Sequence, residues 1–264
     1  MPNTMLQVQR PFSLQHYAKL HNLDPRWVLL NAPNLFSSFY YHRDEFDGTL
    51  DAVYWSTDVT AGGAPTAFAY NAQRNGGARG ATGATDNGVT AIYAPNVQWD
   101  PADNPTWFLR WRAPAAVDGF AFEILWSDAK TDEKLVCFSA TSAAGVPTVT
   151  NGITDFGGLS MNTDHTLTTT AIVGDGTTGS VAGGLVSTWT PTASGIIDMI
   201  IGVGANKTSV QIWDSNTFIG EFSVANGPDS AVLVRPSAIF KVLDTTTKSI
   251  DLLKSVILAE ENAT

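Results

Sequence analysis

The feature that most constrains the fold is a pair of alternating, aromatic-rich segments separated by a short break that contains a proline. In Thr106–Arg112 the residues Trp107, Leu109 and Trp111 occupy every second position, and the same period resumes over residues 120–126. A period of two is typical of β-strands, because successive side chains point to opposite faces of a sheet. We therefore predict two neighbouring strands that each bury a broad face, and a second layer of structure must cover that face.

Further short apolar or β-branched segments follow at a spacing of about 8 to 12 residues, with turn residues between them and little helix. The most apolar of them in the second half, residues 196–203, is expected to lie centrally in a sheet. Residues 209–224 predict a hairpin with four turn residues, in which Phe218, Phe222 and Val224 share a face. About eleven or more antiparallel strands predict an all-β jelly-roll sandwich.

The composition supports a large core and narrows the choice of partners. Hydrophobic residues make up 44% of the 264 residues and include 8 Trp and 13 Phe. The formal net charge of −10 argues against direct binding of nucleic acid, whose phosphates repel such a protein. The lone Cys137 can form no intrachain disulfide and no thiolate metal site.

The chain shows neither a basic and apolar signal sequence nor an apolar run of the roughly 18 residues that a membrane span needs. We therefore expect a soluble protein that is made in a cytoplasm and does not insert into a membrane.

Residues 1–36 differ from the rest of the chain and form an N-terminal arm ahead of the sandwich, to which we assign residues 37–264. The arm is rich in proline and apolar residues, and residues 13–20 have the pattern of a short helix with Ser13 as its N-cap. A free disordered tail would be less apolar, so the arm packs either on its own sandwich or on a partner subunit. The candidate partner-binding residues are Leu6, Arg10, Phe12, Tyr17 and Trp27.

The search for catalytic groups favours a protein that is not an enzyme. A retaining glycosidase needs two carboxyl groups about 5 Å apart, yet Glu123 and Glu221 each stand alone on their predicted strands. A Ser-His-Asp triad would need a placed histidine, and the sequence has no Gly-x-Ser-x-Gly turn beside His165. We therefore predict no catalytic residues and no cofactor.

Ligand binding is a weaker possibility in this sequence. Aspartates in predicted loops could bind calcium, but no Asp-x-Asp-x-Asp loop occurs, so we predict no metal site. Trp99 and Trp189 stand near prolines in predicted loops, where exposed rings could stack on glycans. The alternative for both residues is packing within the core and its turns, which large aromatic side chains commonly do.

Several short motifs together point to a known family. They are Phe46-Asp47-Gly48-Thr49-Leu50-Asp51 with Trp55, Gly77-Ala78-Arg79 leading to Thr82-Gly83-Ala84-Thr85, residues 128–134, the turn at residues 213–220, and residues 248–258. The chain resembles the concanavalin A-like (laminin-G-type) sandwich domains of tailed-phage structural proteins over roughly residues 40 to 258. Residues 248–260 fit a helix or a strand by pattern alone, and the resemblance favours the closing strand of that family.

The resemblance implies a function in the virion. We expect a capsid decoration or cement protein on the capsid surface, which binds the major capsid protein and copies of itself, with a homotrimer as the expected assembly. Many identical copies on a shell would turn modest contacts into strong attachment. The alternative is a tail fibre or tailspike module that binds host-surface glycan.

Overall fold

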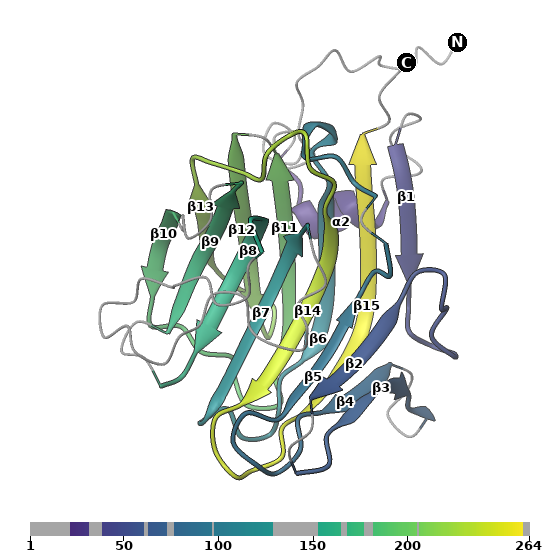
Figure 1. Ribbon diagram of the computed structural model, residues 1–264, viewed down its shortest axis with the longest axis vertical. Coiled ribbons are helices and arrows are strands. Elements are labelled where there is room, and N and C mark those ends of the chain that lie inside the picture. Colours follow the sequence, from purple (N-terminus) through teal and green to yellow (C-terminus); the bar gives the residue numbers. More distant parts are fainter. Residues whose placement is uncertain are drawn as a thin grey trace.

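Two antiparallel β-sheets stack face to face and form a sandwich (Figure 1). The computed structural model describes residues 22–31, 39–60, 63–72, 77–96, 98–128, 153–164, 168–176, 182–204 and 206–260. Within these residues the sheets are accompanied by a short helix, α2 (Pro25–Leu30), and a 3-10 turn, η2 (Pro101–Asp103). No helix in these ranges has the length and hydropathy of a membrane span.

The eight-stranded sheet contains the N-terminal and C-terminal strands side by side. Its spatial order is β13 (Thr217–Val224), β12 (Lys207–Asp214), β11 (Ile196–Gly204), β6 (Thr106–Arg112), β15 (Ser249–Glu260), β4 (Ala78–Ala81) and β3 (Thr66–Tyr70), and β1 (Phe39–Asp44) pairs with β15 beside this path. The interior position predicted for residues 196–203 is confirmed, because β11 lies between β12 and β6. Residues 249–260 form a strand, as the family resemblance implied.

The seven-stranded sheet forms the second layer. Its spatial order is β10 (Ala182–Ser187), β9 (Thr169–Asp175), β8 (Asp155–Asn162), β7 (Phe120–Ser127), β14 (Arg235–Val242), β5 (Val89–Tyr93) and β2 (Ser56–Thr60). The nearly all-β sandwich predicted from the sequence is therefore confirmed.

The two alternating aromatic segments, β6 and β7, lie in opposite sheets. The prediction that they are neighbouring strands of one sheet is therefore wrong. β6 pairs with β11 and β15, whereas β7 pairs with β8 and β14. Their aromatic faces meet across the sandwich, where Trp111 of β6 contacts Phe122 of β7 with ring centroids 5.2 Å apart. The break at residues 113–119 therefore carries the chain from one layer to the other, and each segment provides the cover that the other requires.

The predicted division of faces holds within each strand. Trp107, Leu109 and Trp111 point into the core between the sheets, while Phe108 packs in a separate cluster on the outer face. On β7 the residues at even positions face the core, whereas Ala121 and Leu125 belong to an apolar cluster on the outer face.

The hairpin β12–β13 departs from its prediction in two respects, because its loop has two residues in place of the predicted four and Phe218 lies on a different face. Its loop consists of Ser215 and Asn216, which have φ values of 49° and 70° and so fit the left-handed turn that short hairpins favour. A register shift follows, because Trp213 pairs with Phe218 while Ile212 pairs with Gly220. The predicted common face of residues 218, 222 and 224 is therefore wrong, since this irregularity turns Phe218 to the outer face.

Some predictions fall on parts of the chain outside the described residues. These are the helix at residues 13–20, the arm residues Leu6, Arg10, Phe12 and Tyr17, and the residues Cys137 and His165.

Candidate partner-binding surface

Helix α2 belongs to the N-terminal arm and begins at a strong local signal. The side chain of Asp24 accepts a hydrogen bond from the backbone N–H of Arg26 at 2.9 Å, and Pro25 occupies the first turn. An aspartate cap satisfies an amide that has no partner inside the helix, and proline is tolerated there because its missing N–H would be unpaired anyway. The pair Asp24-Pro25 is a sequence signal for the start of this helix, but we predicted a helix in the arm only at residues 13–20.

The helix packs on the outer face of the eight-stranded sheet of its own chain. Val28 and Leu29 are buried there against Phe108 of β6 and Val256 of β15, in a cluster that also contains Ile200, Trp213 and Leu258. Burial of two such side chains contributes about 1.5–3 kcal/mol each. Of the two arrangements considered for the arm, residues 22–31 therefore adopt packing on the chain's own sandwich.

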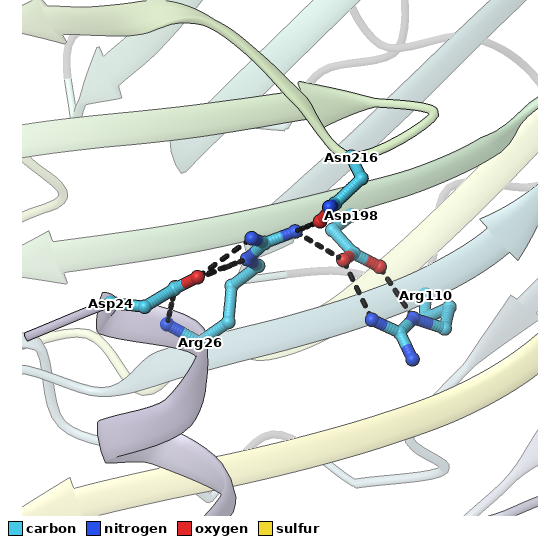
Figure 2. Close-up of polar contacts among 5 residues, drawn as sticks. All are labelled: Asp24, Arg26, Arg110, Asp198 and Asn216. Atoms are coloured by element: carbon cyan, nitrogen blue, oxygen red, sulfur yellow. Dashed lines mark hydrogen bonds and ion pairs between the residues drawn. The ribbon is translucent and has the colours of Figure 1, made fainter.

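Arg26 connects the start of α2 to β11 and to the β12–β13 hairpin (Figure 2). Its Nη1 donates hydrogen bonds of 3.0 Å to Asp198 of β11 and to Asn216 of the β12–β13 turn. Its guanidinium also lies over the ring of Trp213, 4.8 Å from the ring centroid. These contacts bring α2, β11 and the β12–β13 hairpin into one unit.

Asp198 is shared between two arginines. Arg110 of β6, which lies directly across from it in the ladder, donates from Nε at 2.6 Å and from Nη2 at 2.8 Å. Hydrogen bonding to Asp198 raises the pKa of Arg110 despite partial burial. The side chain of Asp198 is 5% exposed, so this carboxylate depends on its two arginine partners for compensation.

The charges at the helix start reinforce this attachment. Burial would raise the pKa of Asp24, but hydrogen bonds and charge from Arg26 outweigh it and the pKa lies below its ordinary value. Hydrogen bonding to Asp24 in turn raises the pKa of Arg26. Both groups therefore stay ionised across the physiological range. The Asp24–Arg26 pair lies within the arm segment itself, and the ion pair of Arg26 with Asp198 is the one that joins this segment to the sheet.

Four exposed apolar side chains lie on the elements that this network joins. They are Leu23, Trp27, Ile196 and Phe218, which are 36%, 49%, 38% and 53% exposed, and we refer to them as the α2 patch. Phe218 contacts Trp213, with ring centroids 5.1 Å apart, and the carbonyl of Ile196 accepts a hydrogen bond from Ser215 in the adjacent turn. Large exposed apolar groups on a rigid support are typical of surfaces that bind other proteins.

Among the predicted site residues that the structure describes, which are Trp27, Trp99 and Trp189, Trp27 is the most exposed, at 49%. Trp99 is 6% exposed and packs edge-on against Trp126 in the core, so it offers no open ring face to a sugar. Trp189 is half-buried, packs against Phe122, and donates from Nε1 to Asp214 at 3.3 Å. The buried ring of Trp99 is therefore not available for stacking on a glycan, whereas glycan stacking by Trp189 stays a prediction.

The carboxylates considered for catalysis lie in different sheets. Glu123 of β7 is fully buried and accepts a hydrogen bond from Ser160. Glu221 of β13 lies within ion-pair distance of Lys207 on the adjacent strand. The structure therefore does not bring these two acids together.

Three of the aspartates in predicted loops, Asp100, Asp128 and Asp175, lie in the described part of the chain and have structural partners. Asp100 caps η2, the side chain of Asp128 accepts from Thr154, and the side chain of Asp175 accepts from Asn226. Within the described residues, no group of three or more His, Cys, Asp or Glu side chains has an arrangement that could hold a metal ion.

Comparison with known proteins identifies structures with the same fold, but it identifies no related family by sequence. No protein-family model matches the chain, and no curated protein matches it in sequence. Among solved structures, a protein of unknown function from Shewanella oneidensis MR-1 superposes with a TM-score of 0.55 and 12% identity, over 97% of this chain and 98% of that one.

Two further structures carry informative descriptions. The CBM2 module of the evolved Dit protein of Lactobacillus casei BL23 phage J-1 matches with a TM-score of 0.54 and 12% identity, over 86% of this chain and 98% of that one. Peanut lectin matches with a TM-score of 0.53 and 13% identity, over 86% of this chain and 100% of that one. At these identities the likeness shows the fold alone, which is the concanavalin A-like sandwich of the lectins.

Proposed function

We propose that this chain is a virion structural protein that decorates or cements a capsid shell by protein–protein binding. The observation that carries the proposal is the α2 patch, in which apolar side chains remain exposed on elements that the Arg26 network locks together. A pre-organised surface of this kind loses little conformational entropy on binding. The partners are the major capsid protein and further copies of the chain, in an assembly that we propose to be a trimer.

Two further features support this proposal. The arm supplies both helix α2 and Trp27, so one short segment joins the sandwich to the proposed contact surface. The sequence motifs resemble those of tailed-phage structural proteins, and a module of a phage protein shares the fold.

Fractionation of purified virions tests the location. Heads and tails are separated, and quantitative mass spectrometry measures the copies of the chain in each. Many copies on the heads are expected, whereas a few copies confined to the tails or none on the particle would contradict capsid decoration.

A double variant and a matched control test whether the α2 patch is the contact surface. Particles that lack the chain are mixed with the purified protein and sedimented, and the bound fraction is measured for wild type and for the double variant Trp27→Ala, Phe218→Ala. The double variant is expected to lose binding by about tenfold or more, because aromatic anchors carry much of an interface's binding energy. Val53→Ala, at an exposed apolar residue outside the patch, is the control and should bind as wild type does. Equal binding by all three proteins would exclude the α2 patch as the contact.

The second candidate is a tail fibre or tailspike module that binds host-surface glycan. It is favoured by the lectins among the structures that share the fold, one of which was solved with galactose bound. Saturable binding of the purified chain to host-surface glycans, together with a location on the tails, would support this function over capsid decoration.

A further inference from the structure

The outer face of the eight-stranded sheet, together with α2, carries most of the positive charge in the described part of the chain. Seven of the ten described Lys and Arg residues form ion pairs there with five carboxylates, so this face has a formal charge of +2. The seven cations are Arg26, Arg43, Arg79, Arg110, Arg112, Lys207 and Lys254. The whole chain has a formal net charge of −10, so this face differs in sign from the rest.

The carboxylates of this face lie beneath its arginines. The side chains of Asp198 and Asp251 are each 5% exposed, whereas those of Arg79, Arg110 and Arg112 are 30%, 35% and 34% exposed. Figure 2 shows this arrangement for Asp198, which Arg110 approaches from the neighbouring strand. The charge that meets the solvent is therefore mainly that of the guanidinium groups.

The rest of the molecule has the opposite arrangement. Among the residues whose side chains the structure describes, three cations lie elsewhere, against sixteen carboxylates. Arg235 and Lys248 are buried and Lys241 is half-buried, so none of the three is exposed. The exposed acids outside the cationic face are Asp47, Asp51, Asp86, Asp118, Asp164 and Asp229. Each part of the surface thus buries its minority charge, and the molecule presents one cationic face and an acidic remainder.

Arg112 is only weakly engaged within its own chain. Arg79 donates from Nε and Nη2 to the two carboxylate oxygens of Asp251, at 2.6 Å and 3.0 Å. Arg112, the ladder partner of Asp251 on β6, keeps its Nε 3.7 Å from that carboxylate, and this Nε has no hydrogen-bond partner. Its Nη1 reaches the carbonyl of Ser194 at 3.5 Å, the upper limit of a hydrogen bond. The exposed end of Arg112 therefore retains donors for a carboxylate from outside the chain.

Two cations also stand directly opposite each other in the sheet. Arg110 of β6 is the ladder partner of Lys254 of β15. Like charges at directly opposite positions destabilise a sheet, and here Asp198 and Glu45 offset the repulsion from the two sides. Further carboxylates placed over this pair would reduce the repulsion, so the face gains electrostatically from an acidic partner.

We propose that Arg79, Arg110, Arg112 and Lys254 form a surface, on β4, β6 and β15, that docks on the acidic remainder of a second copy of this chain. Two such cationic surfaces would repel each other, so the contact joins unlike surfaces of the two copies. A contact of this heterologous kind can close into a ring, as a trimer requires. The inference rests on the proposed self-association but not on attachment to a capsid. The α2 patch lies outside these three strands and stays available.

Sedimentation velocity of the free, full-length chain tests the proposal without particles. The copies are expected to associate reversibly, with a Kd that rises about tenfold or more between about 0.01 M and about 1 M NaCl, because salt screens exposed charges. Species larger than a dimer are expected, since a heterologous contact leaves one surface of each kind open until a ring closes. A chain that stays monomeric at low salt, an association that salt does not weaken, or a series that stops at the dimer would overturn the inference. Particle binding, measured separately, would still decide the capsid proposal.

Two variants with the same change in net charge locate the contact. Arg112→Gln is expected to raise the Kd of self-association about tenfold or more, because it removes the charge and the donors that meet a partner's carboxylate. Its urea midpoint should equal that of wild type, since Arg112 makes only long contacts within the chain. Lys241→Gln, on the seven-stranded sheet, should not raise the Kd. Equal Kd values in wild type and Arg112→Gln, or an equal increase in both variants, would show that the arginine surface is not the contact.

Discussion

At the scale of single residues, the chain concentrates its charges in cross-strand clusters on the outer face of the eight-stranded sheet. Asp198 lies between Arg26 and Arg110, and Asp251 of β15 similarly lies close to Arg79 and Arg112. The first cluster ties helix α2 to the sheet, whereas the second joins strands only. These two aspartates therefore allow the attachment of α2 to be separated from the general stability of the sheet.

Asp198→Asn is expected to lower the free energy of unfolding by about 2 kcal/mol, because it leaves two arginines without their carboxylate. Urea unfolding followed by tryptophan fluorescence measures this loss. The variant should also loosen α2 and allow trypsin to cleave after Arg26 under native conditions. Asp251→Asn is the matched control, which should lose similar stability without faster cleavage at Arg26. Equal cleavage rates in the two variants would show that Asp198 does not hold the helix.

His42 gives a prediction about pH. It stacks on Tyr54, with ring centroids 3.8 Å apart, and burial lowers its pKa below the ordinary 6.5 although Asp44 and Asp51 act in the opposite direction. Between the folded-state pKa and 6.5, the unfolded chain binds a proton that the folded chain does not bind. Acidification through this window therefore reduces the free energy of unfolding. His42→Phe keeps an aromatic ring without the titration, so it should lose less stability than wild type between about pH 7.5 and about pH 5. Urea unfolding midpoints are measured for both proteins at the two pH values. An equal decrease of the midpoint in wild type and in His42→Phe would contradict the prediction.

At the scale of elements, the close approach of β8 to β7 depends on a glycine. A Cβ at Gly158 would lie 2.4 Å from the backbone oxygen of Ile124 and 2.5 Å from Cα of Leu125. Neither backbone atom can move without disturbing the ladder between the two strands. Gly158→Ala should therefore lower the free energy of unfolding by about 2 kcal/mol, as measured by urea denaturation. Gly48→Ala, where a Cβ meets no atom within 4 Å, should have a much smaller effect.

The elements also show which parts of the fold a sequence can predict. The alternation in Thr106–Arg112 correctly identified the core-facing residues, because the period of two is a local property of a strand. It could not identify the partner strands, since β15 follows more than a hundred residues later in the chain. The face of Phe218 was missed because one register irregularity, which leaves no clear trace in the sequence, reverses the alternation.

The candidate surfaces were predictable only in part. Trp27 was identified from its place in an apolar arm, and Asp24-Pro25 could have located its helix. The network around Asp198 was not identified, because the sequence does not show that Arg26 and Arg110 meet this carboxylate in space. Their meeting depends on the pairing of β6 with β11 and on the packing of α2, and both become visible only in the folded chain.

At the scale of the whole molecule, the two outer faces of the sandwich have different properties. The eight-stranded sheet presents an apolar area beneath α2 and charge clusters beyond it. The outer face of the seven-stranded sheet carries a second apolar cluster, which includes Leu125, Phe156 and Ile172. Attachment to a shell by the first face would leave the second face directed away from that shell.

The final prediction concerns what α2 does for the whole molecule. Leu29 is buried among the apolar side chains of the outer face, so Leu29→Asp would place a charge in apolar surroundings, which is costly. The helix should then leave the sheet and expose Phe108, Ile200 and Val256 to solvent. An apolar area of this kind promotes association, so light scattering coupled to size-exclusion chromatography should report larger species than in wild type.

Trp27→Asp is the matched control for this experiment. It adds the same charge to the same helix at a half-exposed position, and Val28 and Leu29 remain free to hold α2 on the sheet. This variant should keep the association state of wild-type protein in solution while it loses attachment to particles. If Leu29→Asp kept the wild-type association state as well, α2 would not be the cover of the eight-stranded sheet, and the arm would act only through its exposed side chains.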